Sequence, residues 1–262
     1  MSLSDRLLFA ARTAREAGKL AQTMRKNPNA LNIAEKGHQD FVTAADTAVE
    51  DLIRLRIREA FGDDAVLGEE GGLQGTNTHL WIIDPIDGTT NFMRGLPDWA
   101  VSIAYCHDGE IVLGVIFAPD LDLMAQGHSG VGGSAQLNGV PMAVSKARAA
   151  NTALVTVGWS PRTEFSAHAA LLGDLIAKGA EYRRPGAATI GLLSVAAGWT
   201  DAYVEKHLNV WDAAAGIALI RSAGGTVKMP PLEHYLQHGA SLCALCSEEH
   251  ELSALLQNYH AS

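Results

Sequence analysis

The segment from Trp81 to Phe92 constrains this chain more than any other part of it. It reads Trp-Ile-Ile-Asp-Pro-Ile-Asp-Gly-Thr-Thr-Asn-Phe, so an apolar run ends in Asp84, turns at Pro85 and offers a second carboxylate at Asp87. The Gly-Thr-Thr that follows presents backbone N–H groups and hydroxyls where a helix can begin. Carboxylates beside free amides suit a hard cation together with an oxyanion, because the cation joins two groups that otherwise repel. A strand followed by an ordinary turn is the plain alternative.

Two further acidic segments favour the functional reading. Glu69 and Glu70 stand between glycines after another apolar run, and Asp212 opens a small-residue helix pattern at 211–216. Each has a plain alternative of its own: exposed turn glutamates in the first case, and a first-turn acid that complements the helix dipole in the second. Only the three segments together point to a site.

Apolar spacing predicts the elements that carry these segments. Helical periodicity predicts helices over 3–26 and 45–61, and short β-branched runs then predict strands. The expected strands in the first half are 65–67, 80–83, 100–106 and 111–118, the last two joined in a hairpin by the turn at 107–110. After about residue 148, strands and helices alternate, with strands at 153–157, 202–204, 226–229 and 242–245 and helices at 164–178, 211–222 and the C-terminus.

This change of rhythm predicts two tightly joined subdomains. Residues 1–148 are expected to form an α+β unit with the first two acidic segments, and residues 149–262 an α/β unit with Asp212. The 262 residues are 47% hydrophobic and 19% charged, which is enough apolar material for a full core.

Charge and cysteine content limit the partners and the compartment. Twenty basic against twenty-nine acidic residues give a net charge of −9, which disfavours nucleic acid or an anionic membrane as a partner but not an anionic substrate at a cation site. The three cysteines are too few for a disulfide scaffold and suit a reducing compartment. No run approaches the ~20 apolar residues of a membrane span, and the first residues form an amphipathic segment rather than a signal peptide. We therefore expect a cytoplasmic protein.

The three acidic segments also match a known pattern. A Gly-Glu-Glu turn at 68–70, Asp-Pro-Ile-Asp-Gly-Thr-Thr-Asn-Phe at 84–92 and Trp-Asp-x-x-Ala-Gly at 211–216 occur in the order found in the inositol monophosphatase family. On these motifs the chain resembles the family's Mg²⁺-dependent sugar and inositol phosphatases along nearly its whole length, and residues 36–46 resemble bacterial members in particular. The resemblance implies a layered α-β-α-β-α sandwich of the inositol monophosphatase / fructose-1,6-bisphosphatase type, α+β toward the N-terminus and α/β toward the C-terminus.

By the same resemblance, two or three Mg²⁺ ions are the expected cofactors. Glu69, Asp84 and the backbone carbonyl of Ile86 are expected to hold one ion. Asp84, Asp87 and Asp212 are expected to hold a second, with Asp84 bridging. These are oxygen ligands, which Mg²⁺ prefers. One ion would activate a water and the other would stabilise the leaving alkoxide, so phosphoryl transfer needs no protein nucleophile.

The resemblance implies catalytic residues as well. Thr89 and Asp46 match the pair that orients and helps to deprotonate the water alongside Glu69. The N–H groups of Gly88 and Thr89 are expected to cradle the phosphate at the start of the following helix. Asp46 also has a structural reading, because Thr43 and Asp46 fit a helix capping box. Both readings hold together, since a cap fixes the position of the carboxylate.

Substrate contacts are expected from the second half of the chain. Glu205 stands at the family position that contacts inositol hydroxyls, and Gly186, Ala187 and Ala188 resemble a stretch that lines the ring. Many relatives carry a hydroxyl residue where Ala187 stands, so one polar contact is missing here. Asn91 favours the inositol-phosphatase-like branch.

A second pattern competes for a metal. His234, His238, Cys243 and Cys246 offer four possible zinc ligands within a short stretch. The gap between the two pairs is too short for the structure that a zinc finger folds around its metal. We therefore expect Cys243 in a late strand and the histidines in a Pro-led loop.

The sequence thus predicts a phosphoric monoester hydrolase acting on a small polyol phosphate, first of all myo-inositol 1-phosphate. Histidinol phosphate, fructose 1,6-bisphosphate or a 3′-phosphonucleotide are alternatives on the same scaffold, decided by Glu205, Ala187 and nearby loops. A regulatory binding protein is the alternative of another class, although clustered carboxylates without a cation cost stability and argue against it as the sole role. Family members are commonly homodimers and are often inhibited by Li⁺, so both properties are expected by resemblance.

Overall fold

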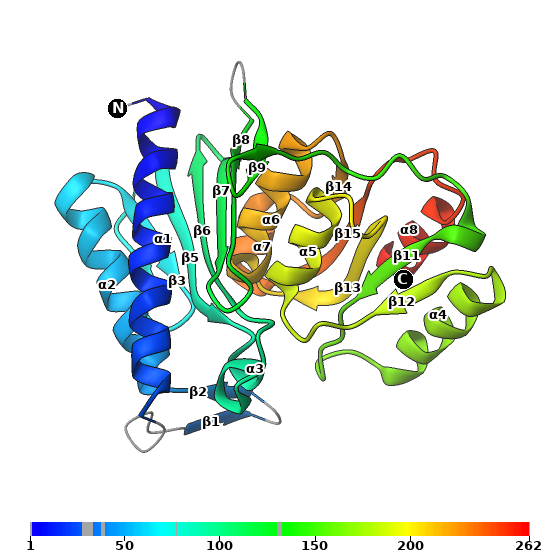
Figure 1. The fold of residues 1–262 in the computed structure, drawn as a ribbon, viewed down its shortest axis with the longest axis horizontal. Helices are drawn as coiled ribbons and strands as arrows, with labels where there is room; N and C mark the ends of the chain where they lie inside the picture. The colour runs from blue at the N-terminus through cyan, green and yellow to red at the C-terminus, as the bar shows by residue number, and fades with distance from the viewer. Residues whose placement is uncertain (1, 28–33, 38–39, 77, 130–132, 262) are drawn as a thin grey trace.

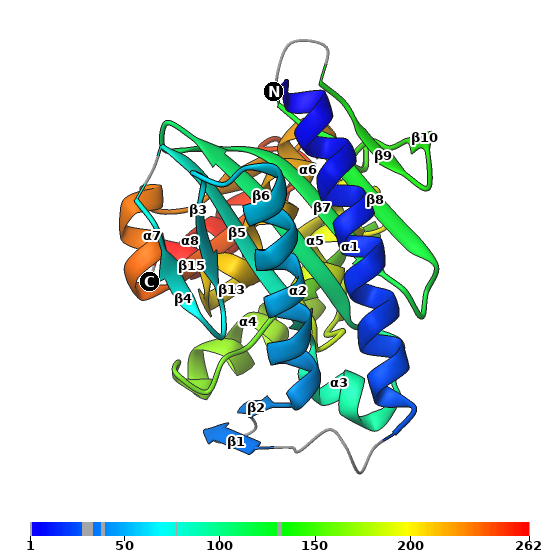
Figure 2. The same ribbon diagram turned by 90° about the vertical axis from the view of Figure 1, so that its left-hand side faces the viewer.

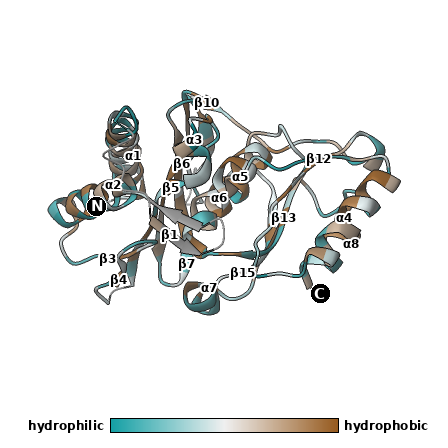
Figure 3. Ribbon diagram, turned by 90° about the horizontal axis from the view of Figure 1, so that it is seen from below, coloured by the Kyte–Doolittle hydropathy of each residue, from teal (hydrophilic) through white to brown (hydrophobic). Residues whose placement is uncertain are grey.

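The computed structural model describes residues 2–27, 34–37, 40–76, 78–129 and 133–261, so His38 and Gln39 of the bacterial-type stretch lie outside it. Across these residues the chain is layered as helices, sheet, helices, sheet and helices (Figures 1 and 3). This confirms the α-β-α-β-α sandwich predicted by the resemblance.

The first layer is a pair of helices, α1 (Leu3–Arg25) and α2 (Ala44–Ala60), which lie side by side on the larger sheet (Figure 2). Both begin in a capping box, Ser2 with Asp5 and Thr43 with Asp46, in which side chain and backbone satisfy each other's hydrogen bonds. A short hairpin of β1 (Ala34–Gly37) and β2 (Asp40–Val42) connects them.

The second layer is the larger sheet, in which the described residues form eight strands in the order β10-β9-β8-β7-β6-β5-β3-β4. The strands are β3 (Ala65–Gly68), β4 (Gly72–Gln74), β5 (His79–Asp87), β6 (Ala100–His107), β7 (Glu110–Ala118), β8 (Leu123–His128), β9 (Ala135–Leu137) and β10 (Val140–Pro141). β3 runs parallel to β5, and the other pairs are antiparallel. The predicted β6–β7 hairpin is confirmed: its turn residues Asp108 and Gly109 both have positive φ, as a tight two-residue turn requires.

The fourth layer is the smaller sheet, with the described order β12-β11-β13-β15-β14. Its strands are β11 (Leu154–Val157), β12 (Glu181–Arg183), β13 (Ala202–Leu208), β14 (Thr226–Lys228) and β15 (Ala240–Leu245). The outer face of this sheet is covered by α4 (Phe165–Ala177) and α8 (Ser253–Ala261) (Figure 3). A 3₁₀ helix at Ala150–Thr152 leads into β11.

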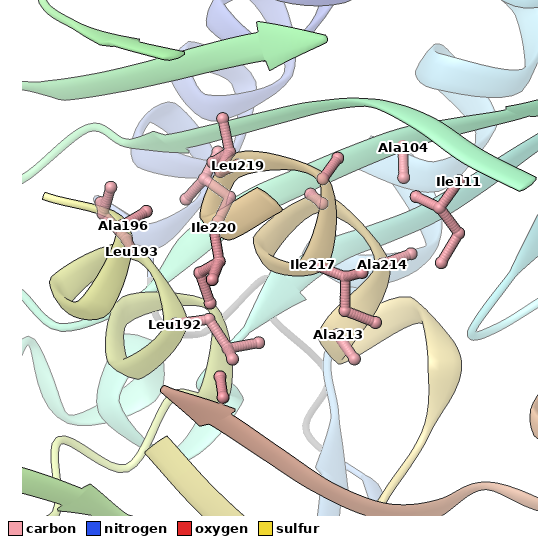
Figure 4. Packing of buried hydrophobic residues seen from close by; sticks show 14 of the residues in the cluster. Ala104, Ile111, Leu192, Leu193, Ala196, Ala213, Ala214, Ile217, Leu219 and Ile220 are labelled. Atoms are coloured by element: carbon pink, nitrogen blue, oxygen red, sulfur yellow. The ribbon is translucent and has the colours of Figure 1, made fainter. Parts of the chain in front are cut away.

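The middle layer, α5 (Ala188–Ala196) and α6 (Val210–Ser222), is buried between the two sheets. Small residues allow this close packing. A Cβ atom on Gly114 of β7 would lie 2.3 Å from the carbonyl oxygen of Ala215, and one on Gly216 would lie 2.5 Å from the Cβ of Leu192. The apolar side chains of both helices form one core with the inner face of the larger sheet (Figure 4). The two helices of this layer therefore come from the second half of the chain but pack against the sheet that the first half forms.

The structure corrects one expectation about the late loop. His234 and His238 lie on the helix α7 (Leu232–His238), not in a loop, because Pro231 occupies its N-cap, where proline is well tolerated. Both histidines are exposed, whereas Cys243 is fully buried in β15 as predicted. The four residues of the proposed zinc pattern therefore do not point to a common centre.

Two findings bear on the wider predictions. The two sheets fall on either side of residues 148 and 149, but the division into subdomains at that point remains a prediction. Among the helices that the structure describes, none combines the length and apolar character needed to cross a membrane.

Candidate active site

The active-site carboxylates depend first on a bulge in β5. Asp84 pairs with Ser102 and Asp87 with Ala100, so three steps along β5 match two steps along β6. In a regular strand, residues three apart face opposite sides of the sheet, but one extra residue brings them to the same side. The Asp-Pro-Ile-Asp sequence is therefore the means by which one strand presents two carboxylates to one site.

Asp212 brings the third carboxylate from α6. Oxygen atoms of Asp84, Asp87 and Asp212 all lie within 4.8 Å of one another, although Asp212 is more than 120 residues further along the chain. Asp84 is fully buried, and its Oδ2 has no hydrogen-bond partner among the described residues. An orphaned buried carboxylate oxygen inside an all-oxygen cluster fits a hard divalent cation.

Burial raises the pKa of each of these acids, and repulsion by neighbouring acids adds to the rise for Asp84 and Asp212. Burial, followed by the charges of Glu69 and Asp212, raises the pKa of Asp84 well above its ordinary value. Burial raises the pKa of Asp87 to about 6. Burial and the charge of Asp87 raise the pKa of Asp212 to about 8. Without a cation, the fold therefore favours protons on this cluster.

Helix starts hold two of the three acids in place. The N–H of Asn209 donates to Asp212 Oδ2 at 3.1 Å, so Asp212 closes the first turn of α6. Asp87 accepts hydrogen bonds from both the N–H, at 2.7 Å, and the hydroxyl of Thr189 at the start of α5. Since the N-cap residue of α5 is Ala187, which has no capping side chain, Asp87 takes that role from across the site.

Glu69 approaches from the turn between β3 and β4. It is half-buried, and its charge is the second-largest cause of the raised pKa of Asp84, after burial. The predicted turn of paired glutamates at the end of a strand is therefore confirmed, and this turn brings Glu69 close to Asp84.

The predicted pair of Asp46 and Thr89 is also in contact. Thr89 Oγ1 lies 3.4 Å from Asp46 Oδ1 and 3.1 Å from the carbonyl oxygen of Ile86, so one hydroxyl proton has two acceptors. Asp46 Oδ2 accepts the N–H and hydroxyl of Thr43 at 2.8 and 2.6 Å, which confirms the capping box. Burial raises the pKa of Asp46 to about 6, against those hydrogen bonds. The structural role of Asp46 is therefore confirmed, and its catalytic role stays a prediction.

A cavity of about 160 Å³ adjoins the carboxylates. Its walls include the metal-site acids Asp87 and Asp212 together with the predicted substrate-contact residues Glu205, Gly186, Ala187 and Ala188. Glu205 is buried, accepts the hydroxyl of Tyr203, and lies where a second bulge interrupts the pairing of β13 with β15. A Cβ on Gly158 would lie 2.1 Å from Glu205 Oε2, so the glycine leaves the space that this carboxyl occupies.

Comparison with known proteins agrees with this geometry. The model of the inositol monophosphatase family matches residues 2–261. The chain is 38% identical over 218 residues to the Nus factor SuhB of Xylella fastidiosa, covering 82% of this chain and 78% of that protein. It is 40% identical over 200 residues to the inositol-1-monophosphatase of Rhizobium meliloti, covering 74% of each. The inositol monophosphatase structure from Anabaena superposes with a TM-score of 0.83 at 30% identity, covering 98% of this chain and 97% of that one.

The chain belongs to the inositol monophosphatase family. It is accordingly a phosphomonoesterase, and the acidic cluster has the composition of a metal site in a family that is in general Mg²⁺-dependent.

Several site residues and contacts of this family member were not predicted from the sequence. Thr189 ends the stretch expected to line the ring, but its bond to Asp87 was not predicted, nor was that of Tyr203 to Glu205, while Trp159 and Arg184 line the cavity. Tyr203 had a usable signal, because residues two apart on a strand share a face. Trp159 and Arg184 stand outside the three motifs and had none.

Among the described residues one other group of possible ligands is buried, formed by Asp201, Cys246 and His250. Two of its polar atoms bond the backbone, whereas His250 Nε2 has no hydrogen-bond partner among the described residues. His250 Nδ1 accepts the N–H of Leu252 at 3.1 Å, and Asp201 Oδ2 accepts that of Leu154 at 2.9 Å. Burial also raises the pKa of the Cys246 thiol.

Magnesium should stabilise the protein more strongly as the pH rises. The raised pKa values of the three acids mean that the metal-free fold holds protons that the unfolded chain, with pKa values near 3.8, has released. That contribution to stability is complete below about pH 4 and is lost as the pH rises toward 8. A bound cation replaces the protons and so prevents this loss. The gain in the free energy of unfolding that Mg²⁺ gives should therefore grow by up to about 1.4 kcal/mol per pH unit for each proton displaced.

Thermal unfolding in saturating Mg²⁺ and in EDTA, from about pH 5.5 to about pH 8, measures this difference. The buried histidines titrate in both samples, so their contribution cancels in the difference between the Mg²⁺ and EDTA samples. In the Asp84→Asn variant the rise with pH should flatten. A Mg²⁺-induced shift of equal size at every pH would contradict the assignment of the cation to these carboxylates.

Proposed function

We propose that this phosphomonoesterase hydrolyses a small polyol phosphate with Mg²⁺, and that myo-inositol 1-phosphate is its preferred substrate. The observation that carries the proposal is the adjacency of two features. Two acids of the carboxylate cluster, Asp87 and Asp212, line a small cavity beside Asp84 and its orphaned oxygen, and the buried carboxyl of Glu205 lines the same cavity.

The carboxylates supply the ligands for the cation. Glu69, Asp84 and the carbonyl of Ile86 would hold one Mg²⁺, and Asp84, Asp87 and Asp212 a second, and the family resemblance implies two or three ions in all. When bound, the ions lower the pKa of the attacking water and neutralise the charge on the leaving oxygen. The chain itself then needs only to position the water, the phosphate and the ring.

Asp46 and Thr89 provide the proton path for the water. The Thr89 hydroxyl accepts the water's proton while passing its own to Asp46 Oδ1, 3.4 Å away. Thr43 fixes the other oxygen of Asp46, which leaves Oδ1 free for this role. Glu69 faces the same water from the opposite turn as a second base.

The phosphate is expected at the start of α3 (Thr89–Arg94). The N–H of Thr89 opens the first turn of this helix and is available to an oxyanion. The N–H of Gly88 faces the carboxylate of Asp87 and so orients a metal ligand as well. Gly88 has φ +86°, and a Cβ there would lie 2.9 Å from the carbonyl oxygen of Asp98, so glycine is required.

The lining of the cavity suits a small polyol, because the buried carboxyl of Glu205 lies in the wall that also holds Asp87 and Asp212. Histidinol phosphate, fructose 1,6-bisphosphate and a 3′-phosphonucleotide remain the alternatives within the family. Inhibition by Li⁺ is part of the same proposal, as competition for the Mg²⁺ ligands.

Phosphate release tests the reaction and the substrate together. With Mg²⁺ the protein should prefer inositol 1-phosphate over histidinol phosphate, fructose 1,6-bisphosphate and adenosine 3′,5′-bisphosphate, and EDTA should abolish release. Asp87→Asn should lower kcat/KM by more than about 100-fold, because a metal ligand is lost while the amide oxygen still accepts the Thr189 N–H. Full hydrolysis by this variant would refute the metal assignment.

A regulatory role is a second candidate, and the relatives named Nus factor SuhB favour it. Such a role would rest on a binding surface and would survive Asp87→Asn. That the chain has no nucleic-acid partner stays a prediction from its net charge of −9. Because these relatives are named Nus factors, nucleic-acid binding should be tested directly.

The role of Glu205 is tested by comparing two substrates. Glu205→Gln should lower kcat/KM for inositol 1-phosphate by about 10- to 100-fold, because a charged hydrogen bond to ring hydroxyls is lost. Hydrolysis of p-nitrophenyl phosphate, which has no ring hydroxyl, should change less than about threefold. Gly158→Ala should act in the same direction by displacing Glu205. Equal losses on both substrates would place Glu205 in the chemical step instead.

We also propose that the protein is a homodimer. β12 is an exposed edge strand, and the surface it forms with α4 displays Phe165, Ile176 and Tyr182, which are 62%, 55% and 38% exposed. An exposed edge beside apolar side chains suits a second copy of the chain. A cytoplasmic location fits the three free, buried cysteines.

Sedimentation velocity tests the dimer. The protein should sediment as a dimer, and Phe165→Lys with Ile176→Lys should shift it to a monomer. Leu73→Lys is the matched control, because Leu73 is 60% exposed on β4, an edge strand of the larger sheet. A monomeric wild type, or a dimer that survives the double substitution, would contradict this surface.

A further inference from the structure

A buried ion pair on α2 stands next to the active site without contributing a ligand to it. Glu50 and Arg54 are only 2% and 5% exposed, and Arg54 Nε lies 2.8 Å from Glu50 Oε1. Burying both charges removes them from water, so such a pair is poor evidence for stability by itself. What the pair holds is more informative.

The pair holds the turn that carries Glu69. Glu50 Oε2 accepts the N–H of Glu70 at 2.8 Å, and Oε1 accepts the N–H of Gly71 at 2.7 Å. Arg54 donates to the carbonyl oxygen of Gly72 at 2.6 Å on the far side of the turn and to that of Val66 at 3.3 Å on the near side. The two charged side chains therefore bond to both strands of the β3–β4 hairpin and to the turn between them. One of the bonded groups is the N–H of Glu70, the residue that follows Glu69.

The glycines of this turn make room for the pair. A Cβ on Gly68 would lie 2.6 Å from the carboxyl carbon of Glu50, and one on Gly71 would lie 2.7 Å from Oε1. These contacts are closer than any side chain tolerates, so Gly-Glu-Glu-Gly-Gly is shaped around Glu50 as well as around Glu69.

The same helix also fixes the other side of the reaction centre. Asp46 and Glu50 are four residues apart on α2 and so lie on one face of the helix. Asp46 reaches Thr89, while Glu50 and Arg54 reach the Glu69 turn. One rigid helix thus sets the distance between the two groups assigned to the attacking water.

We propose that Glu50 and Arg54 are positioning residues for Glu69, which hold its carboxylate where it meets Asp84 and so set the affinity of that side of the site for Mg²⁺. The inference rests on the proposed function, because it takes Glu69 as a metal ligand.

The test removes both charges together, as Glu50→Leu with Arg54→Met. Replacing a whole buried pair by apolar residues of similar size is often tolerated, whereas a single change leaves a buried charge alone. Glu50→Gln is the second variant, which keeps one acceptor for the two turn amides and should show a smaller effect in the same direction.

The first readout needs no activity. Hydrogen exchange at the Glu70 and Gly71 amides in the metal-free protein should speed up by at least about 10-fold in the double variant, because their acceptors are gone. The second readout is calorimetric titration with Mg²⁺, in which affinity should fall by about 10- to 100-fold, as for other partners of metal ligands. In hydrolysis, the Mg²⁺ concentration for half-maximal rate should rise by a larger factor than that by which kcat at saturating Mg²⁺ falls, because saturating Mg²⁺ restores the ligand role of Glu69 but not its exact position.

Glu16→Gln with Arg56→Met is the matched control, since it removes an exposed ion pair, 2.6 Å long, between Arg56 of the same helix and Glu16 of α1. It should leave exchange at both amides and Mg²⁺ affinity unchanged. The proposal is overturned if the double variant folds with unaltered exchange and affinity, or if the control lowers affinity equally. If instead the wild type binds no Mg²⁺ and releases no phosphate, the proposed function fails, and exchange at the two amides still reports whether the pair fixes the turn.

Discussion

Repulsion among three carboxylates is the constraint around which this structure is arranged. Asp84, Asp87 and Asp212 come from two elements and place their oxygens within 4.8 Å of one another, in a position where burial already disfavours charge. Such an arrangement persists only where the surroundings determine it more strongly than the repulsion opposes it. The bulge in β5, the amides at the start of α5 and the first turn of α6 each fix one acid. The cost of assembling the cluster is what makes it receptive to a cation.

The middle helix layer connects that chemistry to the packing of the whole molecule. Asp87 binds the start of α5 and Asp212 lies in the first turn of α6, so both acids stand at the positive ends of helix dipoles. The same two helices approach each other and the larger sheet closely because Gly114 and Gly216 lack side chains. The Ala-Gly that ends the Trp-Asp-x-x-Ala-Gly motif is thus a packing requirement, and the Asp is a functional one.

The sequence motifs predicted that Glu69, Asp84, Asp87 and Asp212 belong to one acidic site. They could do so because each motif has a local cause for its shape: a glycine turn, a bulge or a capped helix. They did not reveal what those acids touch. Thr189 meets Asp87 across 102 residues, and Glu50 meets Gly71 across 21, and no local pattern encodes either contact. α5 was missed because it is apolar on nearly all sides, as expected for a helix buried between two sheets, so it has no stripe to detect. α7 was missed because Pro231 was interpreted as a break rather than as a helix start.

The shared middle layer also governs how the chain reaches its native state. The larger sheet is complete when residue 141 has left the ribosome, but α5 and α6, which cover its inner face, are made only afterwards. Until they arrive, a broad apolar face with an unfinished acidic site stands open to other nascent chains. Folding of this protein is therefore committed late in synthesis, and truncation before Ser222 leaves an aggregation-prone fragment rather than a smaller working enzyme.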